Sequence, residues 1–139
     1  MKTVLVGGCF DILHIGHITF LEKAKKEGDI LVVLLESDEV IRKSKGKDRP
    51  INNQEDRAKI LLALKYVDRV IPLPYMKTDR EYDELVEKIK PDIIATTFGD
   101  PGISHKIRQA KKLGIELKIV TNMIKDSSTT NLIKLLGYF

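Results

Sequence analysis

The sequence lacks the features that mark membrane, secreted and disulfide-bonded proteins. Its longest wholly apolar run, Ile30 to Leu35, has six residues, whereas a membrane-spanning helix needs about 20. The first residues contain no apolar segment followed by a small-residue cleavage site, as a signal peptide would. Cys9 is the only cysteine, which excludes an internal disulfide and any multi-cysteine zinc or iron–sulfur site. We therefore expect a cytoplasmic protein that does not contact a membrane.

Several sequence patterns of nucleotide and nucleic-acid binding are also missing. Neither the P-loop pattern nor the GxGxxG fingerprint occurs, so kinase-type and dehydrogenase-type functions lose their main support. The formal net charge of +4 is modest, and a field of this size does not by itself indicate nucleic-acid binding. The four Tyr and four Phe form no stacking platform. We therefore expect no nucleic-acid partner.

The sequence does contain a regular alternation of short apolar runs and amphipathic stretches, with Gly, Pro, Asn or Asp at the junctions. An unbroken apolar run such as 30–35 is typical of a parallel strand covered on both faces. The pattern predicts one α/β domain over residues 1–139, a Rossmann-like three-layer sandwich with a five-stranded parallel sheet. The expected strands are 2–9, 30–36, 69–73, 92–97 and 116–120, and the expected helices are 16–27, 54–66, 79–89, 103–113 and 128–136.

Ligands of such sheets bind beyond the carboxyl ends of the strands, and the loop after the first strand is the most informative one. Gly7 and Gly8 allow a ligand to approach the backbone, and the loop leads into a helix whose free N–H groups favour phosphate. Gly16 lies where a side chain would block that approach. His14 and His17 are three residues apart, so both would face an anion at the helix start and stabilise charge that develops during nucleotidyl transfer.

Other interpretations of this loop are less favoured. An isolated pair of histidines more often consists of one buried and one exposed side chain without a catalytic role. A zinc site would need a third ligand, and the remaining histidine, His105, lies in a distant predicted helix. Cys9 is better suited to fill a small space beside a ligand than to act as a nucleophile. We therefore expect no metal held by protein side chains.

Two motifs at opposite ends of the chain point to one family. The segment 10–17, FDILHIGH, resembles the HxGH signature of the cytidylyltransferase-like nucleotidyltransferases, and 128–130, STT, resembles their second signature at the start of the last helix. The resemblance implies an enzyme that joins a nucleoside triphosphate to a phosphorylated small acceptor and releases pyrophosphate. It further implies a magnesium ion carried by the triphosphate and a homodimer.

The resemblance also assigns site residues. It implies that His14, His17 and Lys45 are catalytic. Lys45 belongs to the loop after the second strand, where five of the eight residues 42–49 are basic; such a run suits a triphosphate clamp, although a solvated charged loop is the alternative. The expected nucleotide-binding residues are Gly7, Gly8, Cys9, Phe10, Asp11, Gly16, Arg57, Gly99, Asp100, Ser128, Thr129 and Thr130.

The subfamily is less sharply indicated. The segments 45–52, KGKDRPIN, and 128–133, STTNLI, look most similar to heptose-phosphate adenylyltransferase domains of lipopolysaccharide-core biosynthesis, followed by glycerol-3-phosphate cytidylyltransferases. FAD synthetases, which are FMN adenylyltransferases, share the motifs and rank third, because the cysteine-bearing C-terminal segment associated with them is missing. A non-catalytic nucleotide-binding module with the same fold also stays open. The residues before Gly99, 96–98, depart from the family pattern, so base and acceptor remain open.

Overall fold

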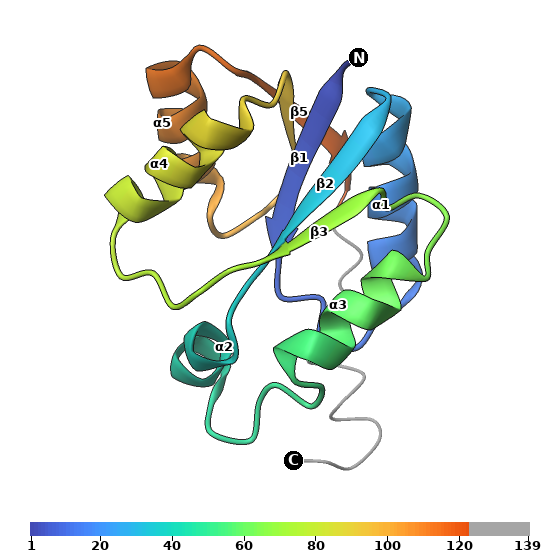
Figure 1. Cartoon of the computed structure of the whole chain (residues 1–139), viewed down its shortest axis with the longest axis vertical. Coiled ribbons are helices and arrows are strands. Elements are labelled where there is room, and N and C mark those ends of the chain that lie inside the picture. The colour runs from blue at the N-terminus through green and yellow to red at the C-terminus, as the bar shows by residue number, and fades with distance from the viewer. Residues whose placement is uncertain (123–139) are drawn as a thin grey trace.

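The five apolar runs form one parallel sheet in the computed structural model, which describes residues 1–122 (Figure 1). The strand order is β3-β2-β1-β4-β5, and every neighbouring pair is parallel. The chain thus adds β2 and β3 on one side of β1 and then β4 and β5 on the other side. The strand order reverses between β1 and β4, and open α/β sheets bind ligands at such a reversal. The strands are β1 (Thr3–Gly8), β2 (Ile30–Leu35), β3 (Arg69–Pro72), β4 (Ile93–Thr97) and β5 (Glu116–Thr121).

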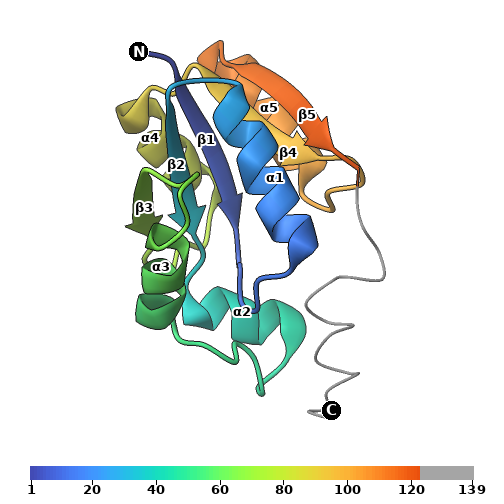
Figure 2. The same cartoon turned by 90° about the vertical axis from the view of Figure 1, so that its right-hand side faces the viewer.

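Helices cover both faces of the sheet (Figures 1 and 2). One face packs against α1 and α3, through buried residues such as Leu21 and Leu61, and the other packs against α4 and α5, through Val86 and Ala110. The predicted three-layer α/β sandwich is thus confirmed. The helices are α1 (Ile15–Lys26), α2 (Asp38–Lys45), α3 (Gln54–Leu62), α4 (Asp79–Ile89) and α5 (Ile103–Leu113). None of the helices within residues 1–122 is long and apolar enough to cross a bilayer.

The alternation along β2 explains why its sequence is apolar throughout. Leu31, Val33 and Leu35 face the α1 and α3 layer, whereas Val32 and Leu34 face the α4 and α5 layer. A strand in the middle of a parallel sheet is buried on both sides, so neither set of alternating positions can be polar. The short β3 contains Pro72, which lacks a ladder donor, and it is an edge strand.

The structure corrects two element assignments. The segment 36–49, expected as a loop, contains α2, which begins where the Ser37 hydroxyl accepts the Val40 N–H at 3.2 Å. Acidic residues in its first turn, basic residues in its last turn and the fully buried Ile41 stabilise this helix. The helix expected at 54–66 ends at Leu62, because the next residues form tighter turns. The helix expected at 128–136 lies outside the described residues.

Candidate active site

Two cavities meet at the carboxyl ends of the strands. The helix α2 lies at this end of the sheet (Figure 2). The first, which we call the α1-side cavity, has a volume of about 220 Å³. The second, the α4-side cavity, has a volume of about 320 Å³ and lies between the sheet and the helices α4 and α5. Among residues 1–122, only Gly7, Gly8 and Lys106 line both cavities. The two cavities are therefore neighbouring compartments of one candidate site at the end of β1.

His14 and His17 cap the start of α1 reciprocally. Nδ1 of His14 accepts the backbone N–H of Gly16 at 3.0 Å, and Nδ1 of His17 accepts the backbone N–H of His14 at 3.3 Å. Since both Nδ1 atoms act as acceptors, the proton of each neutral ring must be on Nε2. The capping arrangement thus leaves two Nε2–H donors at the helix start, and His17 lines the α1-side cavity.

Both histidines are neutral at pH 7. Burial lowers the pKa of His14 below 6.5. Burial, together with repulsion from His14 in its protonated form and from Lys45, lowers the pKa of His17 to about 4. Neutral rings can still stabilise an anion by donating hydrogen bonds, as preorganised N–H donors do in other active sites. The predicted pair therefore suits phosphate binding through hydrogen bonds rather than through charge.

The backbone before the histidines is shaped by Gly8 and Phe10. Phe10 has a φ of 47°, a left-handed conformation that non-glycine residues rarely adopt. Its buried ring lies 5.4 Å from the ring of His17. A Cβ atom on Gly8 would lie 2.9 Å from the Phe10 ring, so any other residue would require this buried ring to move. This tight turn brings the backbone of Gly8 to the wall of the α1-side cavity.

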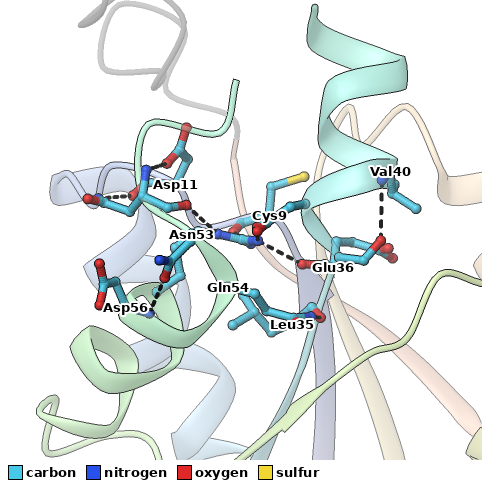
Figure 3. Close-up of polar contacts among 12 residues, drawn as sticks. Cys9, Asp11, Leu35, Glu36, Val40, Asn53, Gln54 and Asp56 are labelled. Atoms are coloured by element: carbon cyan, nitrogen blue, oxygen red, sulfur yellow. Dashed lines mark hydrogen bonds and ion pairs between the residues drawn. The ribbon is translucent and has the colours of Figure 1, made fainter. Parts of the chain in front are cut away.

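The structure corrects the role expected of Asp11 (Figure 3). Its carboxylate is fully buried, and one oxygen pairs with Nε of Arg49 at 3.0 Å and accepts the Ile51 N–H at 2.8 Å. The other oxygen accepts the Asn52 N–H at 2.9 Å. Asp11 therefore does not line either cavity with its side chain; it fixes the segment 49–52 that leads into α3.

Arg57, which was expected at the phosphates, is likewise held in a buried network, and its role there stays a prediction. Its side chain is completely buried, and its guanidinium donates to groups at the ends of β1 and β2. The acceptors are the carbonyl oxygens of Asn52 at 3.0 Å, Cys9 at 2.7 Å and Glu36 at 3.0 Å, and the carboxylate of Asp38 at 2.6 Å. Of these residues, Cys9 and Glu36 are labelled in Figure 3.

Lys45 is placed differently from Arg57. It is the last residue of α2, is exposed, and makes no hydrogen bond or ion pair within residues 1–122. Its charge lowers the pKa of His17 and opposes the upward shift that burial gives to the pKa of Cys9. The ammonium is therefore close enough to act on the loop of the two histidines, and its catalytic role stays a prediction.

Asp100 lines the α1-side cavity and is fixed by three partners. It accepts hydrogen bonds from the Thr96 hydroxyl at 2.6 Å and the Gly102 N–H at 2.8 Å, and it pairs with Lys106. Burial alone would raise its pKa, but these partners hold the pKa below its usual range. Gly99, with a φ of 78°, makes the turn that brings Asp100 to the cavity.

Sequence reasoning missed the polar residues of the α4-side cavity. Glu36 accepts a hydrogen bond from the Tyr82 hydroxyl at 3.0 Å, and both residues line this cavity with Gln109 and Lys106. Burial raises the pKa of Glu36 and of Tyr82. Only Glu36 had a usable signal, since it directly follows the apolar run of β2 and so lies at the carboxyl edge. Tyr82 and Lys106 belong to no recognisable motif.

Two expected features are not described by the structure. The residues Ser128, Thr129 and Thr130 lie outside residues 1–122, so their expected role at the phosphates stays a prediction. Within residues 1–122, no three His, Cys, Asp or Glu side chains form a group that could hold a metal ion.

Comparisons with known proteins find relatives over most of the chain. The family model Cytidylyltransferase-like matches residues 5–134. The bifunctional protein HldE of Aliarcobacter butzleri is 41% identical over 133 residues, which cover 96% of this chain and 26% of that protein. The FAD synthase of Thermococcus kodakarensis is 54% identical over 119 residues, which cover 84% of this chain and 76% of that protein. The chain thus spans about a quarter of one relative and three quarters of the other.

A solved structure has the same fold. The lipopolysaccharide core biosynthesis protein from Thermoplasma volcanium superimposes with a TM-score of 0.71 and 34% identity, over 89% of this chain and 97% of that one. Pantothenate synthetase from Thermus thermophilus, at 13% identity and a TM-score of 0.61, shares the fold alone. The family match over most of the chain, together with the HxGH cap at the end of β1, shows that this chain belongs to the cytidylyltransferase-like family of nucleotidyltransferases.

Proposed function

We propose that this chain transfers an adenylyl group from ATP to the phosphate of a small acceptor and releases pyrophosphate. The observation that carries this proposal is the reciprocal cap of His14 and His17, which presents two Nε2–H donors beside the glycines of the β1 loop. ATP is the preferred donor because the named relatives include FAD synthases, whose product contains an adenylyl group. CTP, the donor of the glycerol-phosphate subfamily, is the alternative.

The chemistry needs little more than alignment and charge stabilisation. An oxygen of the acceptor phosphate forms a bond to the α-phosphorus, while the bond from that phosphorus to the bridging oxygen breaks and pyrophosphate leaves with the electron pair. Because the acceptor phosphate is already ionised at pH 7, no strong general base is required. His14 and His17 would donate hydrogen bonds to the oxygens on which charge develops, and Lys45 would neutralise the triphosphate.

The two cavities suggest how the substrates divide the site. The nucleotide would occupy the α1-side cavity, where Gly8 and His17 meet the phosphates and Gly99 and Asp100 lie toward the base. The acceptor would occupy the α4-side cavity, which meets the first at Gly7 and Gly8. Its reacting phosphate would then approach the α-phosphorus at the end of β1. The segment 128–130, with its three hydroxyls, is proposed to complete the phosphate site.

A sugar or polyol phosphate is our first candidate for the acceptor, as in the synthesis of lipopolysaccharide-core or other surface-glycan precursors. The HldE relatives and the lipopolysaccharide core protein support this choice. The polar groups of the α4-side cavity also support it, since the Glu36 carboxylate and the Gln109 amide can bind hydroxyl groups.

FMN is the second candidate, and two observations favour it. The FAD synthases are 50% and 54% identical over 84% of this chain. In addition, six aliphatic residues of the described part of the chain line the α4-side cavity, and such a lining suits a flat apolar ring better than a polyhydroxylated chain. They are Leu5, Val6, Leu34, Leu73, Val86 and Ile94.

The remaining features of the proposal follow from the family resemblance. A magnesium ion would enter with the triphosphate, held mainly by its oxygens, and would supply further neutralisation of the phosphate charge. We also propose that the chain works as a cytoplasmic homodimer and binds neither nucleic acid nor membranes.

A substrate panel tests the proposal. Purified protein is incubated with ATP or CTP and with a sugar phosphate, glycerol 3-phosphate or FMN, and pyrophosphate release is measured. We expect one pair to give release well above the others, and the same preparation of His17→Ala controls for contaminating enzymes. If no pair releases pyrophosphate while ATP still binds by calorimetry, the chain is a nucleotide-binding module and the proposed activity is refuted.

A further inference from the structure

The point where the two cavities meet contains one side chain. Of the residues that line both cavities within residues 1–122, Gly7 and Gly8 have none, so Lys106 is the only side chain that faces both compartments. It lies in the first turn of α5, the helix that follows β4 along the chain. A cation at this position is adjacent to any pair of groups that approach each other from the two cavities.

The surroundings of Lys106 confirm this position between compartments. On the α1 side its ammonium pairs with Asp100. On the α4 side its positive charge opposes the upward shift that burial gives to the pKa of Glu36. The ammonium therefore lies near two carboxylates that line different cavities.

Lys106 can leave Asp100 at modest cost. Its side chain is 27% exposed, so the ammonium is not sealed in the interior. Asp100 would keep its hydrogen bonds from Thr96 and Gly102, so the carboxylate would not be left without partners. The ion pair thus holds Lys106 in place without fixing it permanently.

We propose that Lys106 is a catalytic residue that binds the acceptor phosphate and the α-phosphate together at the moment of transfer, with Asp100 as the partner that holds it in place between reactions. This inference rests on the proposed function. Two phosphates that approach each other repel, and a lysine ammonium has three donors on one compact charge, so it can bind oxygens of both. Lys106 keeps its proton while the acceptor oxygen bonds to the α-phosphorus and pyrophosphate leaves.

The competing explanation is that the ion pair with Asp100 only secures the start of α5. The variants Lys106→Ala, Lys106→Arg and Asp100→Asn separate the two roles, with Lys111→Ala as the matched control. Lys111 is an exposed lysine near the end of the same helix, far from the carboxyl edge of the sheet.

The experiment measures kcat, KM for each substrate, the affinity for ATP and the thermal midpoint of every variant, with the best pair from the substrate panel. We expect Lys106→Ala to lower kcat about 100-fold, the scale of losing one transition-state donor, with ATP affinity close to that of the wild type. Lys106→Arg should recover part of the rate, and added ethylammonium should partly rescue Lys106→Ala. Asp100→Asn should lower the thermal midpoint, and Lys111→Ala should change nothing.

Several results would overturn the inference. A Lys106→Ala variant with near-normal kcat would do so, as would one in which ethylammonium has no effect and the rate falls only with the thermal midpoint. If the wild type releases no pyrophosphate with any pair, the proposed function fails separately, and binding of FAD and ADP-ribose, which contain both linked phosphates, decides about Lys106. Lys106→Ala should then weaken that binding about tenfold; unchanged affinity, or no binding to the wild type, would contradict the inference.

Discussion

The charged and polar residues around the candidate site form two groups that differ in what their donors and acceptors already bind. In the buried group, every described contact points inward to backbone or to an opposite charge, and this group consists of Asp11, Arg49 and Arg57. The open group consists of His14, His17, Lys45 and Lys106. Each of these side chains keeps at least one N–H donor that has no hydrogen-bond partner within residues 1–122.

The difference shows that a residue type within a motif does not determine its role. Arg57 and Lys45 are both basic residues near the end of β2, yet one stabilises three backbone carbonyls and the other is exposed. A buried guanidinium with four acceptors cannot turn to a phosphate without leaving those carbonyls unpaired. The buried group holds the loops in place, and the open group is left to contact substrate.

The largest expected effect is on folding, through Arg57→Met. The substitution leaves the carbonyls of Cys9 and Glu36 and the carboxylate of Asp38 without this donor. We expect the free energy of unfolding to fall by about 3–5 kcal/mol, the scale of removing one partner of a buried ion pair. Urea denaturation measures this loss.

The matched control for Arg57 is Arg80→Met, since the Arg80 side chain is 85% exposed and, within residues 1–122, pairs only with Glu84 on its own helix. Its effect should stay below about 0.5 kcal/mol. An Arg57→Met protein of nearly normal stability that no longer binds ATP would move Arg57 into the open group and break the comparison.

A smaller effect is expected for Lys45→Ala, on binding rather than on folding. Loss of an exposed ammonium that has no partner in the described part of the chain should leave the unfolding free energy almost unchanged. The Kd for ATP, measured by calorimetry, should rise about tenfold, or roughly 1.4 kcal/mol. Lys88→Ala is the control, because Lys88 is an exposed lysine in the last turn of α4. Equal ATP affinity in both variants would remove Lys45 from the site.

A further prediction concerns pH. Because burial lowers the pKa of His17 from 6.5 to about 4, the unfolded chain takes up the proton first as the pH falls. The stability that the neutral ring contributes is therefore complete above pH 6.5 and decreases between pH 6.5 and about 4. Asp83, with a pKa held at about 2 by Arg108, stays ionised throughout this window.

Urea denaturation at several pH values from 7 to 4.5 measures this slope. In His17→Gln the slope should be shallower, because the titrating ring is gone while a neutral side chain remains. A slope identical to that of the wild type would show that folding does not lower the pKa of His17. That result would contradict the conclusion that His17 is a neutral donor in the cap.

The sequence contained enough to predict the sheet and the position of the site, because strand periodicity and the glycines and histidines after β1 are local signals. It did not predict which charges face inward. The direction of Arg57 depends on the carbonyls of Cys9 and Glu36, which are 48 and 21 residues away along the chain. Lys106 meets the site only because β4 lies next to β1. The helix α2 was missed although Ser37, Asp38 and Glu39 form an ordinary helix start.

The most direct test of the claim that the open group performs the transfer is a single-turnover measurement of pyrophosphate release by the wild type and by His17→Ala at pH 7. The account predicts that the variant releases pyrophosphate about 100-fold more slowly. It also predicts that the variant stays folded, with the loss of the cap costing about 1 kcal/mol. A folded His17→Ala protein that releases pyrophosphate at nearly the wild-type rate would contradict the account.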